Sequence, residues 1–156
     1  MVPLINEFRG EYGIFSNFHR ASIMHAGLQF PSSEHFFQCY KHNDKVDLFY
    51  KIKGHPFKGL KALARSKPCR PDWDQVRDSV MRQALLYKFT QHSNLAKNLL
   101  ATDGTILVEG NYWHDNYWGD CMCQNSSGKH PECLRPGKNR LGFLLMYIRE
   151  TLKFNS

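Results

Sequence analysis

The sequence predicts one compact, mostly helical domain with short strands or hairpins, and three observations lead to that prediction. The chain has 156 residues, 42% of them hydrophobic and 13% aromatic, which is enough to bury one core without disulfides. Several segments repeat apolar residues at helical spacing. Shorter apolar runs between them end at glycine or proline, as strands and hairpins do. No apolar run approaches the ~20 residues that cross a bilayer, so we expect a soluble protein.

The first elements are expected to be extended. Residues 7–18 predict a strand interrupted by a loop at its glycines, and residues 22–24 and 28–30 predict a hairpin around His25-Ala26-Gly27. Pro31 ends this hairpin. Ser32 or Ser33 is then expected to cap a helix that runs to about residue 41, with an acidic residue in its first turn.

Five further helices are expected, separated by turns and one long irregular segment. They are predicted over residues 45–53, 56–66, 72–88 and 93–100 and from 139 on, and the expected caps or first residues are Asp44, Pro56, Asp72, Ser93 and Asn139. A strand is predicted over residues 105–109. Residues 110–138 have almost no periodicity but many aromatics, which indicates a functional loop.

Charge and cysteine content indicate the class of partner and the compartment. The net charge of +7 and the pI of about 9.2 favour a polyanionic partner, either nucleic acid or a phosphorylated metabolite. The basic residues are scattered, so a solvated surface and a phosphate track both remain open. Five cysteines, with no basic start followed by an apolar stretch, predict a reducing cytoplasm.

The helix after Pro31 carries the first candidate site. Glu34, Gln38 and Lys41 fall within an arc of roughly 60°, and the aromatic residues between them face the other way. This arc is either a solvated stripe or part of a site. Asn17 lies between Ser16 and Phe18 in an apolar setting, where its amide must serve as a backbone clamp or as a ligand contact.

The long segment carries the second candidate site. Trp113, Tyr117 and Trp118 surround Asp115, an arrangement that suits a flat heterocycle on a sugar, although the aromatics could equally anchor the loop. A soft-ligand set in the same segment is chemically adequate for zinc, but its spacing is not standard and we expect no metal. That set is Cys121, Cys123, His130 and Cys133. Cys39 is expected to be a small buried residue.

The spaced motifs of this chain resemble those of the NADAR, or YbiA-like, family over nearly its whole length. They comprise Arg9-Gly10; Ser16-Asn17-Phe18; Pro31, Glu34, His35, Gln38 and Lys41; Lys61, Leu63 and Arg65; Trp73 and Arg77; Lys88-Phe89; Leu107-Val108-Glu109; Asp115, Trp118 and Gly119; and Gly137, Asn139, Leu141, Gly142, Leu145 and Met146. The chain departs from the family at Ala64, where glycine is common, and in the insertion-like stretch CQNSSGKHPECLRP.

The resemblance implies an α+β domain over residues 1–156 that hydrolyses N-glycosidic bonds between ribose C1 and an amine of a base. One branch of the family removes ADP-ribose from guanosine in nucleic acid, which the net charge of +7 favours here. Another branch acts on early riboflavin-pathway intermediates, the ribosylaminopyrimidine phosphates. A noncatalytic module that binds ADP-ribose or NAD is the alternative from another class.

The expected chemistry assigns roles to the matched residues. Glu34 and Asp115 are the predicted acid, base or nucleophile pair, with Glu109 and Asp120 as substitutes. Lys41 offers a second route, a Schiff base with the open-chain ribose, and both routes stay open. No cofactor or metal is expected. The residues expected to bind the substrate are Arg9, Gly10, Asn17, Gln38, Lys88, Glu109, Trp118, Gly119 and Asn139.

Overall fold

The computed structural model describes residues 1–42, 49, 57–124 and 128–156. The chain divides into two compact units, residues 17–93 and residues 1–16 with 94–156, and each is described by itself. Helices and short paired strands occur in both units, so the predicted α+β class is confirmed. The expectation of a single domain stays a prediction. The helix predicted over residues 45–53 lies, apart from residue 49, outside the described residues.

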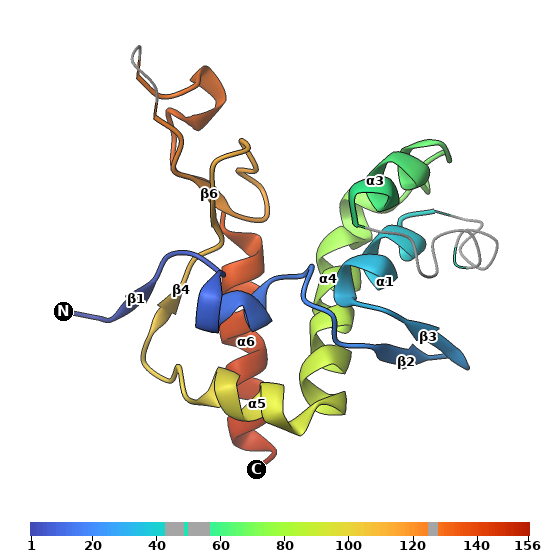
Figure 1. The fold of residues 1–156 in the computed structure, drawn as a ribbon, viewed down its shortest axis with the longest axis horizontal. Coiled ribbons are helices and arrows are strands. Elements are labelled where there is room, and N and C mark those ends of the chain that lie inside the picture. Colours follow the sequence, from blue (N-terminus) through green and yellow to red (C-terminus); the bar gives the residue numbers. More distant parts are fainter. Residues whose placement is uncertain (43–48, 50–56, 125–127) are drawn as a thin grey trace. The chain divides into compact units, whose positions relative to one another are not determined.

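The unit of residues 17–93 contains a hairpin and three described helices (Figure 1). Strands β2 (Ile23–His25) and β3 (Leu28–Phe30) pair antiparallel, with Ile23 opposite Phe30. Ala26 and Gly27 both have positive φ, the backbone that a two-residue hairpin turn requires. The helices are α1 (Ser33–Tyr40), α3 (Phe57–Arg65) and α4 (Trp73–Gln91), as expected from the sequence.

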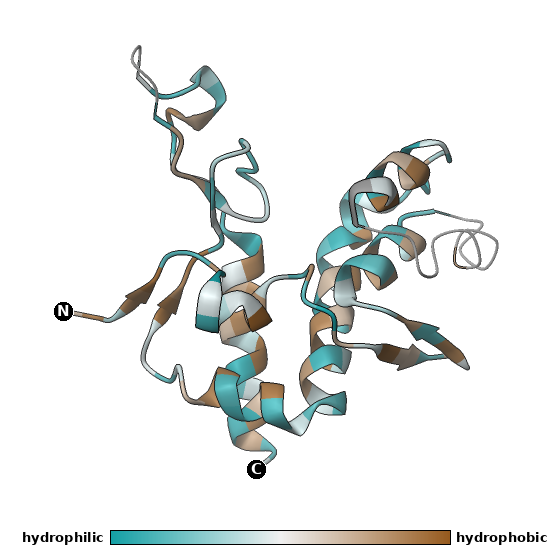
Figure 2. Ribbon diagram, viewed as in Figure 1, coloured by the Kyte–Doolittle hydropathy of each residue, from teal (hydrophilic) through white to brown (hydrophobic). Residues whose placement is uncertain are grey.

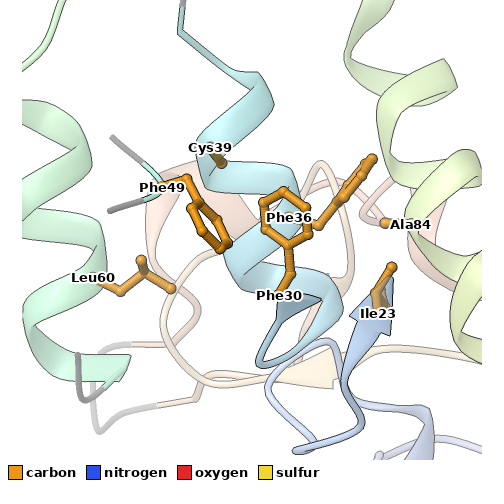
Figure 3. Packing of buried hydrophobic residues seen from close by; sticks show 7 residues of the cluster. All are labelled: Ile23, Phe30, Phe36, Cys39, Phe49, Leu60 and Ala84. Carbon is orange, nitrogen blue, oxygen red and sulfur yellow. The ribbon is translucent and has the colours of Figure 1, made fainter. Parts of the chain in front are cut away.

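The core of this unit lies where α1 packs against α4, α3 and β3. Aromatic rings meet edge to face there: Phe30 lies 5.1 Å from Phe36 and 4.9 Å from Phe49, between ring centroids. Such pairs add to the free energy that the burial of apolar area provides. Figure 3 shows the buried cluster, which consists of Ile23, Phe30, Phe36, Cys39, Phe49, Leu60 and Ala84. The prediction that Cys39 is a buried core residue is confirmed.

Two helix starts differ in how they are capped. Ser32 Oγ accepts a hydrogen bond from His35 N at 3.2 Å, so the predicted cap of α1 is confirmed. The prediction that the Asp72 side chain caps α4 is wrong. The Asp72 carboxylate accepts from Arg70 Nε at 2.6 Å and Nη2 at 2.9 Å and makes no cap hydrogen bond. An adjacent guanidinium therefore takes the carboxylate away from the helix amides.

The other unit pairs short strands around the C-terminal helix. Strand β1 (Leu4–Ile5) is parallel to β4 (Ile106–Leu107), and β5 (Gly110–Asn111) is parallel to β6 (Asp120–Cys121). Helix α6 (Arg140–Phe154) packs on β4. Helix α5 (Ser93–Leu100) begins where the two units meet in the sequence, and η2 (Pro131–Cys133) is a single 3-10 turn.

The strand predicted within residues 7–18 is wrong, because this segment forms a 3-10 helix, η1 (Gly10–Phe15). Gly10 has φ +57° and lets the chain turn into it. Tyr12 and Phe15 are three residues apart and stack at 6.2 Å, and Phe15 meets Phe8 edge to face at 5.8 Å. This three-residue spacing of aromatics stabilises the tight helix over an extended strand.

The long segment is mostly irregular, as predicted, but the expected cap after it is wrong. Asn139 has left-handed backbone, φ 49°, and makes no cap hydrogen bond to α6. Its side chain instead accepts from Glu109 N at 3.0 Å and donates to Leu107 O at 2.9 Å. Both polar atoms therefore join the start of α6 to the end of β4.

The described helices expose polar residues along their length. Figure 2 shows hydrophobic and hydrophilic residues alternating along α4 and α6, as expected for helices that each bury one face. On α6 the buried face carries Leu141, Leu145 and Ile148. Among the described residues, no helix combines the length and the apolar character that a membrane span requires.

Candidate active site

The Glu34 carboxylate is buried in the first turn of α1. Its Oε2 accepts from Asn17 Nδ2 at 3.0 Å, and its Oε1 accepts from Gln38 Nε2 at 2.7 Å. Only 5% of Glu34 and 8% of Gln38 is exposed, so the alternative of a solvated polar stripe is wrong for these two residues. A carboxylate in the first turn also faces the positive end of the helix dipole. Neutral amides and the helix dipole thus stabilise the charge that burial disfavours.

Backbone hydrogen bonds fix Asn17 against the start of α1. Glu34 N and Ser33 Oγ each donate to Asn17 O at 3.1 Å, so two donors near the helix N-terminus have the same partner. Ser32 Oγ also lies 2.7 Å from His35 Nδ1. The predicted Ser-Asn-Phe and Pro-x-x-Glu-His motifs are therefore interlocked, although about 16 residues separate them in the sequence.

Only one of the two polar atoms of the Asn17 side-chain amide has a hydrogen-bond partner among the described residues. Its nitrogen binds Glu34, but its Oδ1 is buried without a hydrogen-bond partner among the described residues. The Asn17 Nδ2 group binds a carboxylate rather than the backbone, so the alternative of a backbone clamp is wrong for this group, and a ligand contact stays a prediction. A buried acceptor without a partner is costly, and a ligand hydroxyl could donate to this atom.

Lys41 lies at the C-terminal end of the same helix and is half-buried. Its backbone is fixed, because Lys41 N donates to Phe37 O at 3.1 Å and Lys41 O accepts from Arg70 N at 3.0 Å. No hydrogen bond or ion pair of its ammonium is found within the part of the chain that the structure describes. Seven residues of helix span ~10.5 Å, so its long side chain and that of Glu34 could contact one ribosyl group.

Lys88 is fully buried near the end of α4. Its ammonium lies 5.3 Å from the centroid of the Phe89 ring. The pKa of the nearby His19 is lowered, first by burial and then by the positive charges of Lys88 and His92. The Lys88 charge thus acts on a partly exposed histidine, and the expectation that Lys88 binds a phosphate stays a prediction.

In the other unit, Asp115 braces the aromatic loop. Its Oδ1 accepts from Tyr117 N at 3.1 Å and from Trp118 N at 2.9 Å. The side chain of the buried Asn111 holds both polar groups of the Asp115 backbone. Asn111 Oδ1 accepts from Asp115 N at 3.1 Å, and Asn111 Nδ2 donates to Asp115 O at 2.8 Å. One oxygen of the Asp115 carboxylate therefore has a structural role. Trp118 meets Tyr117 edge to face at 4.9 Å.

The residues after Asp115 cap α6 with their carbonyl groups. Tyr117 O accepts from Arg140 N at 3.1 Å, and Trp118 O accepts from Leu141 N at 2.9 Å. These amides would otherwise be available to an anion at the helix N-terminus. Gly119 is needed at this point because a Cβ there would collide with Glu109 O. The Asp-x-x-Trp-Gly and Gly-x-Asn-x-Leu-Gly motifs thus form one connected structure.

The remaining predicted residues of this unit are positioned mainly by backbone contacts. Arg9 is exposed, 3.8 Å from Glu7 Oε2 and 6.0 Å from the Tyr112 ring centroid. Gly10 begins η1. Glu109 O accepts from Asp120 N at 2.9 Å, and Asp120 Oδ1 accepts from Gly137 N at 2.7 Å. A cavity of about 420 Å³ in this unit is lined by none of the predicted site residues.

The structure therefore brings the predicted residues together in two groups. One unit holds Asn17, Glu34, Gln38, Lys41 and Lys88, and the other holds Arg9, Gly10, Glu109, Asp115, Trp118, Gly119, Asp120 and Asn139. That the two groups bind one substrate stays a prediction. Sequence reasoning missed Asn111 and Asn116, whose side chains hold the loop. Asparagines inside an aromatic, irregular segment were the available signal.

Comparison with known proteins finds similarity over most of the chain. A sequence model of the NADAR domain matches residues 5–153. N-glycosidase YbiA of Escherichia coli is 41% identical over 144 residues, which are 91% of this chain and 82% of that protein. A riboflavin biosynthesis protein of Vibrio vulnificus is 36% identical over 91% of this chain and 36% of its own length. The NMR structure of Escherichia coli YbiA matches with a TM-score of 0.79 at 39% identity, covering 98% of this chain and 86% of that one.

Proposed function

Since the chain belongs to the NADAR domain family and is an N-glycosidase, we propose that it hydrolyses the bond between ribose C1 and an amine of a base through Glu34. One observation carries the assignment to Glu34. Its buried carboxylate is held by the amides of Asn17 and Gln38, and Asn17 Oδ1 beside it has no partner among the described residues. A ribose hydroxyl that donates to this oxygen would be placed next to the carboxylate.

In the direct route, Glu34 takes a proton from water as the water oxygen bonds to C1. The C1–N bond breaks, and the departing amine receives a proton from a second carboxyl group, for which we propose Asp115. The transition state resembles an oxocarbenium ion, so a buried negative charge near C1 stabilises it. Asn17 and Gln38 act as positioning residues because they fix both oxygens of Glu34.

In the second route, the neutral amine of Lys41 attacks C1 of the ring-opened sugar. The base amine leaves with a proton, a lysine imine forms, and water then hydrolyses the imine to release the sugar. Lys41 fits this role because it is half-buried and follows Glu34 by two helical turns. Glu34 would move the protons in this route too.

For the substrate, we propose ADP-ribosylated guanosine in nucleic acid. The net charge of +7 favours a polyanion, and we propose that the positive charge of Lys88 attracts a phosphate. Trp118 would stack on the base or sugar, and Arg9 would contact a phosphate. The five cysteines, all among the described residues, form no disulfide, which is consistent with action in the cytoplasm.

A second substrate class has its own support. The relative from Vibrio vulnificus is named for riboflavin biosynthesis, and the chain aligns with about a third of it. A ribosylaminopyrimidine phosphate contains the same bond between ribose C1 and an amine. It is smaller and carries less charge than a modified nucleic acid, so it would need fewer of the basic residues.

The experiment compares the two substrates directly. The purified full chain is incubated with an oligonucleotide that carries ADP-ribosylguanosine and with a ribosylaminopyrimidine phosphate, and the products are separated by chromatography. Release of ADP-ribose with the first substrate supports the proposal. Turnover of the second alone supports the riboflavin alternative, and tight ADP-ribose binding without turnover of either overturns catalysis. A steep decrease in the first rate with added salt is expected, because phosphate contacts are screened.

A further inference from the structure

Four soft metal ligands lie together in the irregular segment, outside the residues assigned to catalysis. They are His114, Cys121, Cys123 and Cys133, and their ligand atoms all lie within 4.8 Å of one another. Cys121 and Cys133 are buried, and Cys123 is half-buried. The sequence pointed to His130 as the fourth ligand, but the structure places His114 there. His130 stacks on the His114 ring at 4.3 Å, and its Nδ1 accepts from Glu132 N at 3.4 Å.

The spacing of these atoms matches a tetrahedral centre. With Zn–S bonds of ~2.3 Å and Zn–N bonds of ~2.0 Å, neighbouring ligand atoms of a tetrahedron are roughly 3.5–3.8 Å apart. His114 Nδ1 lies 3.2 Å from Cys133 Sγ and 3.7 Å from Cys121 Sγ. Shifts of a few tenths of an ångström to about one ångström would therefore place all four donors around one ion.

The backbone and one asparagine hold the ligands in place. Asn116 Oδ1 accepts from Cys121 N at 3.0 Å, and Asn116 Nδ2 donates to Cys133 Sγ at 3.2 Å. Cys123 N donates to Cys121 Sγ at 3.3 Å. Such N–H donors to sulfur are typical of the groups that surround and orient metal-bound thiolates. His114 has φ +67°, an uncommon backbone for a residue other than glycine, and it turns the imidazole toward the sulfurs.

We propose that His114, Cys121, Cys123 and Cys133 bind one Zn²⁺ in a closed Cys₃His site. Four protein ligands leave no open position, so the ion is structural rather than catalytic. The ligands bracket residues 115–120, which include Asp115 and Trp118. The site therefore fastens a segment with little regular structure and steadies the loop that caps α6. The activity proposed for Glu34 does not enter this inference.

The test measures metal directly in the full chain. Protein purified under reducing conditions without added chelator is expected to contain one zinc per chain by elemental analysis. Exchange for Co²⁺ should give the visible bands of tetrahedral cobalt and thiolate charge-transfer bands in the near ultraviolet. Removal with a strong chelator should lower the melting temperature by several degrees, and added zinc should restore it.

Matched variants identify the ligands. His114→Asn keeps a side chain that tolerates positive φ and should lose the wild-type cobalt spectrum, whereas His130→Asn should keep it. Cys121→Ser should lose zinc, whereas Cys69→Ser, at an exposed cysteine outside the cluster, should retain it.

Two results on the wild-type protein would overturn the proposal. One is protein that contains no zinc and whose melting temperature does not change when zinc is added. The other is a disulfide between Cys121 and Cys133 in mass spectra of the freshly isolated protein. Equal zinc in all four variants would also contradict it. If a variant does not fold, the wild-type cobalt spectrum still decides.

Discussion

Replacing Glu34 by glutamine separates a catalytic role from a structural one, because the two side chains have nearly the same shape. The carboxylate accepts two hydrogen bonds, one from Asn17 and one from Gln38. Bonds to a charged group are worth about 1 kcal/mol more than neutral ones, so the change forfeits about 2 kcal/mol at most. The substitution also removes a buried charge, whose desolvation cost is of similar or larger size.

The amides around Glu34 can adapt to the new side chain. Asn17 Oδ1 has no partner among the described residues. A rotation of the Asn17 amide would present this oxygen to the N–H of the introduced glutamine. We therefore expect the melting temperature of Glu34→Gln to stay within a few degrees, since 1 kcal/mol corresponds to roughly 2–4 °C in a chain of this size.

The expected effect on turnover is much larger. A glutamine cannot accept or deliver the proton, and loss of a general acid or base costs about 10²–10⁴-fold in rate. The assay follows release of ADP-ribose by chromatography. The melting temperature of the same samples is measured by circular dichroism. Glu11→Gln is the control, because Glu11 is exposed and lies outside the site. Turnover of Glu34→Gln within a few-fold of the wild type would refute the assignment of Glu34.

Three further perturbations test other parts of the structure. If Lys41 forms the imine, borohydride added during turnover should leave a sugar adduct on Lys41 in peptide mass spectra, and an unmodified Lys41 in a productive reaction would point to direct hydrolysis. Gly142→Ala should destabilise the protein by about 1–3 kcal/mol in urea unfolding, because its Cβ would collide with Leu107 O, whereas a change at the neighbouring exposed Phe143 should cost little. The pKa of His19 is lowered in the folded protein, first by burial, so the folded state binds fewer protons at His19 than the unfolded state does. The contribution of His19 to stability is therefore present above about pH 6.5 and is lost as the pH falls through the folded pKa. His19→Gln should therefore lose less unfolding free energy than the wild type between pH 7 and pH 5, and equal losses would contradict this linkage.

The sequence by itself determined the features that depend on neighbouring residues. The glycine turn at His25-Ala26-Gly27 between two apolar runs predicted the hairpin, and Ser32 caps α1 through the amide three residues on. The helix signals also located α3 and α5 within one residue at each end and α4 within three. These predictions succeed because turn chemistry, capping and helical periodicity act over one to four residues.

Only the tertiary structure decided what the polar side chains contact. Glu34 on an isolated helix would be solvated, and it is buried because Asn17, 17 residues earlier, binds its carboxylate. Asn139 can cap a helix by type, but the backbone of Leu107 and Glu109 takes both of its polar atoms. His114 joins the three thiols because the chain folds back between residues 114 and 133. Such partners are distant in sequence, and local propensities carry no information about which of them will meet.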